Sequence, residues 1–217
     1  MQEQVVTISE HRLTGDLRIP NRARALVLFA HGSGSSRRSP RNRYVAGYLN
    51  RLGLATLLMD LLTEAEDRDA SRRFDIDVLA LRLEETLEWL SSQPAAKRLP
   101  LGLFGASTGA AAALVAAAHQ PDRVFAVVSR GGRPDLAEGA LASVRSPTLL
   151  IVGGEDRVVL ELNESARRKL PPSAELEVVP GATHLFEEPG ALDAVADLAA
   201  QWFLRHAPSA PALQSAC

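Results

Sequence analysis

The chain has 217 residues, of which 46% are hydrophobic and 23% charged, and its formal net charge is −2. This size and composition are typical of one soluble globular domain, and the small net charge argues against general affinity for nucleic acid or an anionic membrane. No apolar run is long enough to span a membrane, and the first residues lack the basic and apolar regions of a secretory signal. The only cysteine, Cys217, cannot form an intrachain disulfide, which predicts a cytoplasmic location.

Apolar segments alternate with helical patterns along the chain. An opening hairpin and then mostly apolar strands are expected, in chain order, at residues 4–9, 12–19, 25–30, 54–59, 100–104, 124–128, 147–152 and 176–179. Helices are expected between or after them at residues 44–52, 75–91, 108–119, 137–144, 163–170 and 191–205. Continuous apolar strands alternating with helices predict an α/β fold, with a mostly parallel central sheet and helices on both faces.

The expected elements form a single domain over residues 1–206, and the Ala-, Pro- and Ser-rich residues 207–217 are expected to be a disordered tail. About 18 residues separate the strand at 124–128 from the strand at 147–152. That length accommodates one short helix, at residues 137–144, and no cap domain. An open, shallow site is therefore expected at the carboxyl ends of the strands, where such sheets carry their chemistry.

The most informative motif is G-x-S-x-G, formed by Gly105, Ser107 and Gly109. An apolar strand precedes it and an Ala-rich helix follows it. A sharp turn between strand and helix lifts a serine hydroxyl into the open, and the helix N-terminus supplies free N–H groups for a developing oxyanion. The alternative is a glycine-rich turn whose serine has no chemical role.

Three other loops at strand ends carry groups that acyl transfer requires. His31-Gly32-Ser33-Gly34 follows one strand, Asp156 follows another, and His184 follows the last. The chain order is therefore Ser107, Asp156, His184, with a strand between consecutive members. This is the order of the catalytic groups in α/β-hydrolases.

On these motifs the chain resembles the α/β-hydrolase superfamily, and most closely its small lidless members grouped with dienelactone hydrolases. The resemblance covers about residues 4–206 and rests on HGSG, GASTG, GGEDRVV and GATHLF, at 31–34, 105–109, 153–159 and 181–186. It implies an α/β-hydrolase fold without a cap domain. The best-known dienelactone hydrolases use a cysteine nucleophile, whereas this chain has Ser107, which points to a serine esterase variant.

The chemistry and the resemblance together give each group a role. Ser107 attacks the carbonyl carbon, His184 accepts and returns the proton, and Asp156 orients the imidazole. Glu155, adjacent in sequence, is the alternative acid. The N–H of Thr108 is expected to be one oxyanion donor, and the second is expected from Ser33 or, next to it, Gly34.

Arginines cluster in two segments expected near the mouth of the site, and His31 is expected to shape the glycine-rich loop. The clustered arginines are either a solvated face or binding groups for a carboxylate or phosphate of the substrate, since guanidinium groups suit such anions. The candidates for substrate binding are Arg37, Arg41, Arg130 and Arg133.

The sequence therefore predicts a serine hydrolase that cleaves a carboxylic ester or related acyl bond of a small substrate through an acyl-enzyme at Ser107. The alternatives are a thioesterase or peptidase with the same triad, and a non-catalytic binding protein on this scaffold. The expected partner is a small acyl substrate, with an anionic one as an alternative, and not nucleic acid or membrane. The chain is expected to be a monomer or homodimer. No cofactor or metal is expected, because there is no Cys/His cluster with ligand spacing.

Overall fold

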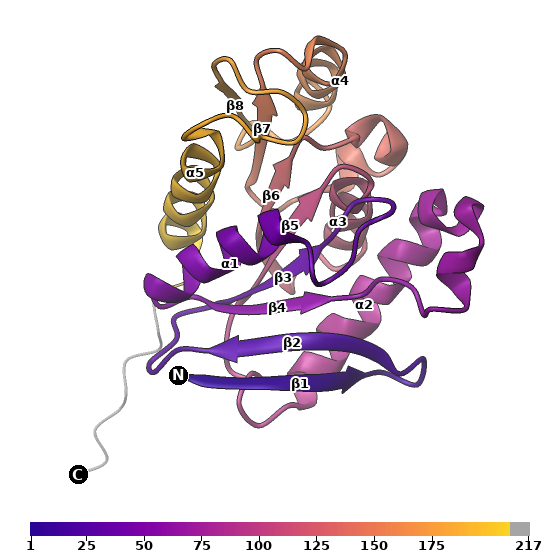
Figure 1. The fold of residues 1–217 in the computed structure, drawn as a ribbon, viewed down its shortest axis with the longest axis vertical. Helices are drawn as coiled ribbons and strands as arrows, with labels where there is room; N and C mark the ends of the chain where they lie inside the picture. The colour runs from indigo at the N-terminus through magenta and orange to yellow at the C-terminus, as the bar shows by residue number, and fades with distance from the viewer. Residues whose placement is uncertain (209–217) are drawn as a thin grey trace.

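The computed structural model describes residues 1–208, so Cys217 and most of the expected tail lie outside the described residues. Its centre is one eight-stranded sheet with the order β1-β2-β4-β3-β5-β6-β7-β8 (Figure 1). The strands are β1 (Gln2–Ile8), β2 (Leu13–Ile19), β3 (Leu26–Ala30), β4 (Ala55–Met59), β5 (Leu101–Ala106), β6 (Val124–Arg130), β7 (Thr148–Gly153) and β8 (Glu175–Val179).

The sheet is parallel from β4 to β8, and the first two strands form an antiparallel hairpin on its edge. β1 pairs antiparallel with β2, and β2 pairs antiparallel with β4. The remaining neighbours pair in parallel, so their carboxyl ends lie along one edge. The α/β class and the mostly parallel sheet predicted from sequence are confirmed.

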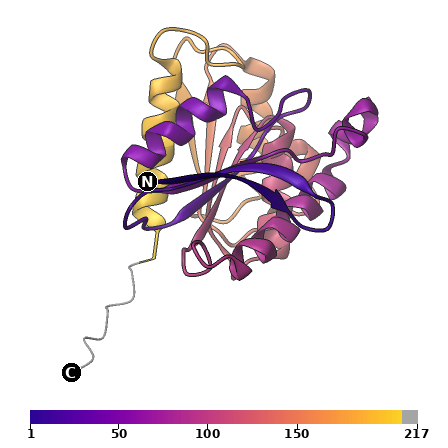
Figure 2. The same ribbon diagram turned by 60° about the horizontal axis from the view of Figure 1, so that its bottom comes forward.

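Helices cover both faces of this sheet (Figures 1 and 2). One layer is formed by α1 (Pro40–Arg51) and α5 (Ala191–His206), which pack on each other and on one apolar core. The other layer contains α2 (Ile76–Ser92), α3 (Thr108–His119) and α4 (Arg157–Arg167), and a second core lies beneath it. Burial of these two apolar faces supplies the main driving force for the fold.

Two helices begin earlier than predicted. Ser39 caps α1 by accepting a hydrogen bond from the N–H of Asn42, and Pro40 occupies the first turn, where its missing N–H is harmless. The helix therefore starts four residues before the predicted residue 44. Helix α4 starts at Arg157 rather than at residue 163, which places Asp156 at its N-cap.

The connection between β6 and β7 has no α-helix at 137–144. It contains two short 3₁₀ helices, η3 (Pro134–Ala137) and η4 (Leu141–Ser143), and no cap domain. The segment between β4 and α2 holds two more, η1 (Glu66–Arg68) and η2 (Ala70–Phe74). Within the part of the chain that the structure describes, no helix combines the length and apolar character needed to cross a membrane.

Candidate active site

Ser107 lies on the turn between β5 and α3, with φ 52° and ψ −121°. A positive φ brings the Cβ of an L-residue against its own backbone, so a serine is strained here. The turn projects the residue from the carboxyl edge of the sheet and leaves it half-buried. The local backbone is that of a nucleophile elbow.

The two glycines of the motif let the elbow pack without a side chain in the way. A Cβ on Gly105 would lie 2.3 Å from the Cα of Ala110 in α3. A Cβ on Gly109 would lie 2.4 Å from the carbonyl oxygens of both Ala30 and His31. Both distances are far below van der Waals contact, so strand, helix and the loop after β3 approach as closely as they do only because these residues are glycine.

Asp156 and His184 meet across the ends of β7 and β8. The Asp156 Oδ2 and His184 Nδ1 atoms are 2.6 Å apart. The Asp156 side chain is 16% exposed and that of His184 is 40% exposed, so the pair lies at an open edge. Glu155, the alternative acid, is exposed, and its N–H donates to the carbonyl of Ala182. The pairing therefore favours Asp156.

One short segment after β6 contacts both the serine and the histidine. The N–H of Ser107 donates to the Arg130 carbonyl at 3.2 Å, and the N–H of Arg133 donates to the Ser107 carbonyl at 3.2 Å. A Cβ on Gly131, whose φ is +51°, would lie 3.5 Å from the His184 ring. The backbone of residues 130–133 thus links Ser107 to His184.

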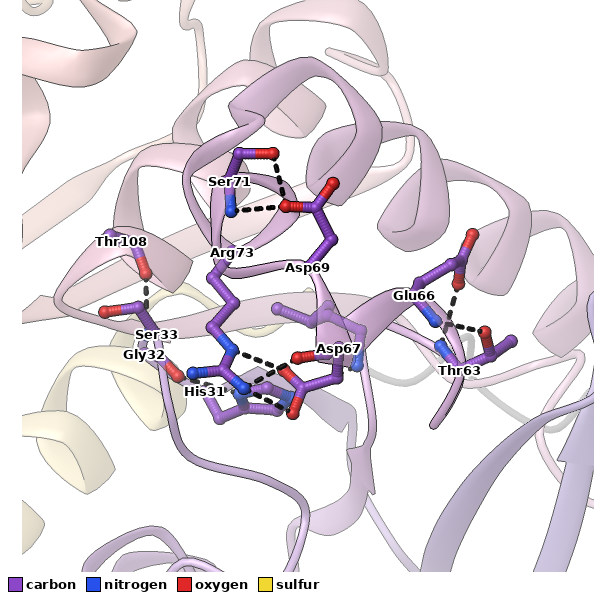
Figure 3. A network of polar contacts seen from close by, with 11 residues as sticks. His31, Gly32, Ser33, Thr63, Glu66, Asp67, Asp69, Ser71, Arg73 and Thr108 are labelled. Atoms are coloured by element: carbon purple, nitrogen blue, oxygen red, sulfur yellow. Dashed lines mark hydrogen bonds and ion pairs between the residues drawn. The ribbon is translucent and has the colours of Figure 1, made fainter.

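The loop after β3 is hydrogen-bonded to the first residue of α3. The N–H of Ser33 donates to the Thr108 hydroxyl at 2.9 Å, as Figure 3 shows. Thr108 begins α3, where backbone N–H groups lack partners within the helix. The sequence placed both residues here but missed the bond, which engages the Ser33 N–H that was expected to serve as an oxyanion donor.

His31 holds this loop through both ring nitrogens. Its Nε2 accepts from the N–H of Leu61 at 3.1 Å, so the proton is on Nδ1, which donates to the Gly32 carbonyl at 2.9 Å. Burial lowers the pKa of His31, and the Gly32 carbonyl and the charges of Asp60 and Asp67 oppose that shift. His31 is therefore neutral at physiological pH and shapes the loop, as the sequence predicted.

A charged network lies against the same loop (Figure 3). Arg73 binds the Asp67 carboxylate through Nε at 2.8 Å and Nη2 at 3.0 Å. Thr63 and Glu66 cap each other at the start of η1. Nothing local in the sequence shows that this charged stretch folds back beside His31.

Three of the four arginines predicted to bind substrate have carboxylate partners. Arg37 binds Asp60 at 2.6 Å, Arg41 binds Glu187 at 2.9 Å and Arg133 binds Asp135 at 2.6 Å. Arg130 differs, because it is the last residue of β6, not part of a loop, and is only 8% exposed. Arg130 therefore lies beside the elbow, but it is buried rather than exposed at an open mouth.

A groove of about 460 Å³ lies on the other side of the loop after β3, where Arg12, Arg37, Asp60 and Thr63 are among its lining residues. It contains none of Ser107, Asp156 and His184. The catalytic candidates lie instead at the open strand edge.

Glu10, His11 and Glu85 are the one group within residues 1–208 with the spacing of a metal site. It joins the β1–β2 turn to α2 and lies apart from the elbow. His11 Nε2 and Glu85 Oε1 are 3.2 Å apart, the distance of a hydrogen-bonded pair.

The model of the alpha/beta hydrolase domain family matches residues 23–204. The chain belongs to this family. The match covers most of the described chain, and the superfamily inferred from the sequence motifs is confirmed.

Similar proteins fall into three groups. A dienelactone hydrolase from Anabaena variabilis is 56% identical, with a TM-score of 0.92 over 95% of this hydrolase chain and 99% of that one. A lidless serine hydrolase from Xanthomonas campestris shares the fold, with a TM-score of 0.78 at 19% identity over 97% of this chain and 98% of that one. Two Mycobacterium tuberculosis proteins, provisionally named phosphoribosyl transferases, are 60% identical over 89% of this chain. The match spans only 44% of their length.

Proposed function

We propose that this alpha/beta hydrolase is a serine hydrolase that cleaves a carboxylic ester or related acyl bond of a small substrate. The observation that carries the proposal is the 2.6 Å contact between His184 Nδ1 and Asp156 Oδ2 at the same sheet edge as the strained Ser107. A histidine oriented in this way through Nδ1 keeps Nε2 available to a serine hydroxyl.

In the proposed reaction, Ser107 Oγ attacks the carbonyl carbon while His184 Nε2 accepts its proton. Asp156 stabilises the imidazolium that forms. The tetrahedral intermediate collapses, His184 protonates the leaving alcohol, and the acyl group stays on Ser107. Water, activated by His184, then releases the acid and restores the serine.

The backbone N–H of Thr108 is the first donor proposed for the oxyanion. The second is the N–H of Ser33, which exchanges the Thr108 hydroxyl for the substrate oxygen when the intermediate forms. Gly34 follows in the same loop and is the next candidate. The Thr108 N–H, at the start of α3, is in place before the reaction and can stabilise the developing charge without reorganising, whereas the Ser33 N–H must first release the Thr108 hydroxyl.

The phosphoribosyl transferase name of the mycobacterial relatives is not carried over to this chain. Those proteins extend well beyond the matched segment, and their named activity describes the whole protein. Ser107, Asp156 and His184 suit acyl transfer, which needs no phosphate-binding loop.

The decisive experiment is labelling with a fluorophosphonate, which reacts with activated serines, followed by intact-mass measurement. We expect one adduct on the wild type and on Ser35→Ala, which removes a hydroxyl from the loop after β3, and none on Ser107→Ala. A folded wild type without an adduct would contradict the proposal and favour a binding protein. A panel of matched esters, thioesters and amides then determines which acyl bond is cleaved.

A further inference from the structure

Arg130 points to the face of the sheet covered by α1 and α5. Ala126 and Val128, two and four residues earlier in β6, both belong to the apolar core beneath those helices. Side chains alternate along a strand, so Arg130 shares their face. Its strand neighbours are Ala106 of β5 and Ile151 of β7, which place it directly beside the elbow.

The Arg130 guanidinium is buried without a counter-charge. Its Nη1 is shielded from solvent and has no hydrogen-bond partner among residues 1–208. Among residues 1–208, no carboxylate forms an ion pair with it, whereas Arg37, Arg41 and Arg133 each contact one. A buried cation in this state is unfavourable unless something else compensates it.

The charged residue that acts on Arg130 is another arginine, Arg41, which is itself paired with Glu187 at 2.9 Å. Burial, and after it the charge of Arg41, lowers the pKa of Arg130 to about 10, so the guanidinium remains protonated at neutral pH. Arg41 lies in the first turn of α1, where no acidic residue is present. That turn carries the partial positive charge of the helix, which usually attracts acidic side chains.

Arg130 adjoins the catalytic candidates through its backbone. The Arg130 carbonyl accepts the Ser107 N–H, and the next residue, Gly131, lies against the His184 ring. The backbone of Arg130 thus contacts Ser107 directly, so an anion bound by its side chain would lie at the same end of the sheet as an acyl group on Ser107. A guanidinium fits the oxygens of a carboxylate or phosphate.

We propose that Arg130, supported by Arg41 and the N-terminus of α1, forms a subsite that binds an anionic oxygen group of the substrate. The inference rests on the proposed hydrolase function, because it assigns the subsite to the substrate of that reaction. It identifies the substrate class as acyl compounds that carry a carboxylate or phosphate near the scissile bond.

The test compares 4-nitrophenyl hydrogen glutarate with 4-nitrophenyl pentanoate, whose acyl chains differ mainly in the terminal carboxylate. Arg130→Met should lower the anionic-to-neutral ratio of kcat/KM about 10- to 100-fold, mainly through KM, because hydrogen bonds between charged groups are lost. The matched control is Arg123→Met, which removes an exposed arginine paired with Glu88 near the opposite end of β6. Its ratio should stay at the wild-type value. An unchanged ratio in Arg130→Met would overturn the subsite.

A binding measurement separates the subsite from catalysis. Glutarate should raise the Tm of Ser107→Ala, and should not do so in Ser107→Ala/Arg130→Met. Inorganic phosphate in place of glutarate distinguishes the two anion types. If Arg130→Met does not fold, glutarate must still raise the wild-type Tm more than neutral glutaramide does, and equal shifts would overturn the proposal.

The two proposals fail in distinguishable ways. In one outcome, both esters are hydrolysed in a Ser107-dependent way, but the anionic-to-neutral ratio of kcat/KM does not change in Arg130→Met. This outcome would refute the subsite and leave the hydrolase function standing. An Arg130-dependent shift in Tm without hydrolysis of any ester would refute the hydrolase function and support an anion-binding site.

Discussion

The elbow around Ser107 and the loop pair that holds Asp156 and His184 contribute to one site in different ways. The elbow is enclosed by backbone, and there is no room for a methyl group at Gly105 or Gly109. The Asp156–His184 pair lies at the open end of the sheet, where the histidine side chain is 40% exposed and bonded to one carboxylate.

Because of this difference, substitutions in the two regions should affect stability and activity differently. Changes in the elbow act on packing and should reduce stability together with activity. Changes in the Asp156–His184 pair remove an orienting hydrogen bond from a half-exposed ring and should reduce activity while the fold persists. The two regions can therefore be separated by measuring Tm and kcat on the same variants.

The largest expected effect is on catalysis at the open end. Asp156→Asn should lower kcat by about 10⁴-fold, because the amide cannot hold the required tautomer or stabilise the imidazolium. Its Tm should stay within about 2 °C of the wild type, since the change affects a single half-exposed contact. Glu155→Gln is the control and should keep nearly full activity. Equal losses in both variants would contradict the assignment of the acid.

The second-largest expected effect is on the stability of the fold and comes from the tightly packed elbow. Gly109→Ala would place a Cβ 2.4 Å from two backbone carbonyl oxygens, which cannot move aside like a side chain. We expect a loss of about 3 kcal/mol, or about 6–12 °C in Tm. Gly139→Ala is the control, because nothing lies within 4 Å of its added Cβ. A Gly109→Ala variant as stable as Gly139→Ala would show that the elbow is not tightly packed.

The smallest expected effect is on stability and concerns His31, which holds the glycine-rich loop after β3. Burial lowers the pKa of His31, so the unfolded chain binds a proton at His31 more readily than the folded one. Stability from this group is present above its unfolded pKa of about 6.5 and is lost as pH falls below that value, by at most about 1.4 kcal/mol per pH unit.

Denaturant unfolding at pH 5 to 8 measures this linkage. His31→Gln cannot titrate and can still accept the Leu61 N–H, so its stability should fall less steeply on acidification than that of the wild type. Burial also lowers the pKa of His206. Both proteins contain His206, so its contribution cancels when their stabilities are subtracted. Parallel curves for the two proteins would argue against a buried neutral His31.

The sheet and its motif loops were predictable because their signals are local. Apolar strands of five to seven residues are flanked by glycine-rich turns, and the order of Ser107, Asp156 and His184 indicated the family. Helix starts were less predictable. The basic residues around Ser39 and Pro40 suggested a solvated loop, although the capping residue and the proline of a helix start were both present. At residues 137–144, Gly139 lies between two 3₁₀ turns where one helix was expected.

The features of the site that were missed all depend on contacts distant in sequence. The bond from Ser33 to Thr108 joins residues 75 positions apart. The pairing of Arg73 with Asp67 is local, but its position beside His31 follows only from the packing of η1 and η2. Arg130 looked like one of several loop arginines, because the exposure of a residue at a strand end is set by the helices that cover it.

The positive φ of Ser107 sets catalysis against stability at a single position. Glycine adopts such a conformation freely, whereas serine is strained there by about 1–3 kcal/mol. A screen that selected only for thermal resistance would therefore favour Ser107→Gly and discard the proposed nucleophile. Engineering this protein for heat tolerance should begin at positions far from the elbow, where added stability does not compete with the reaction.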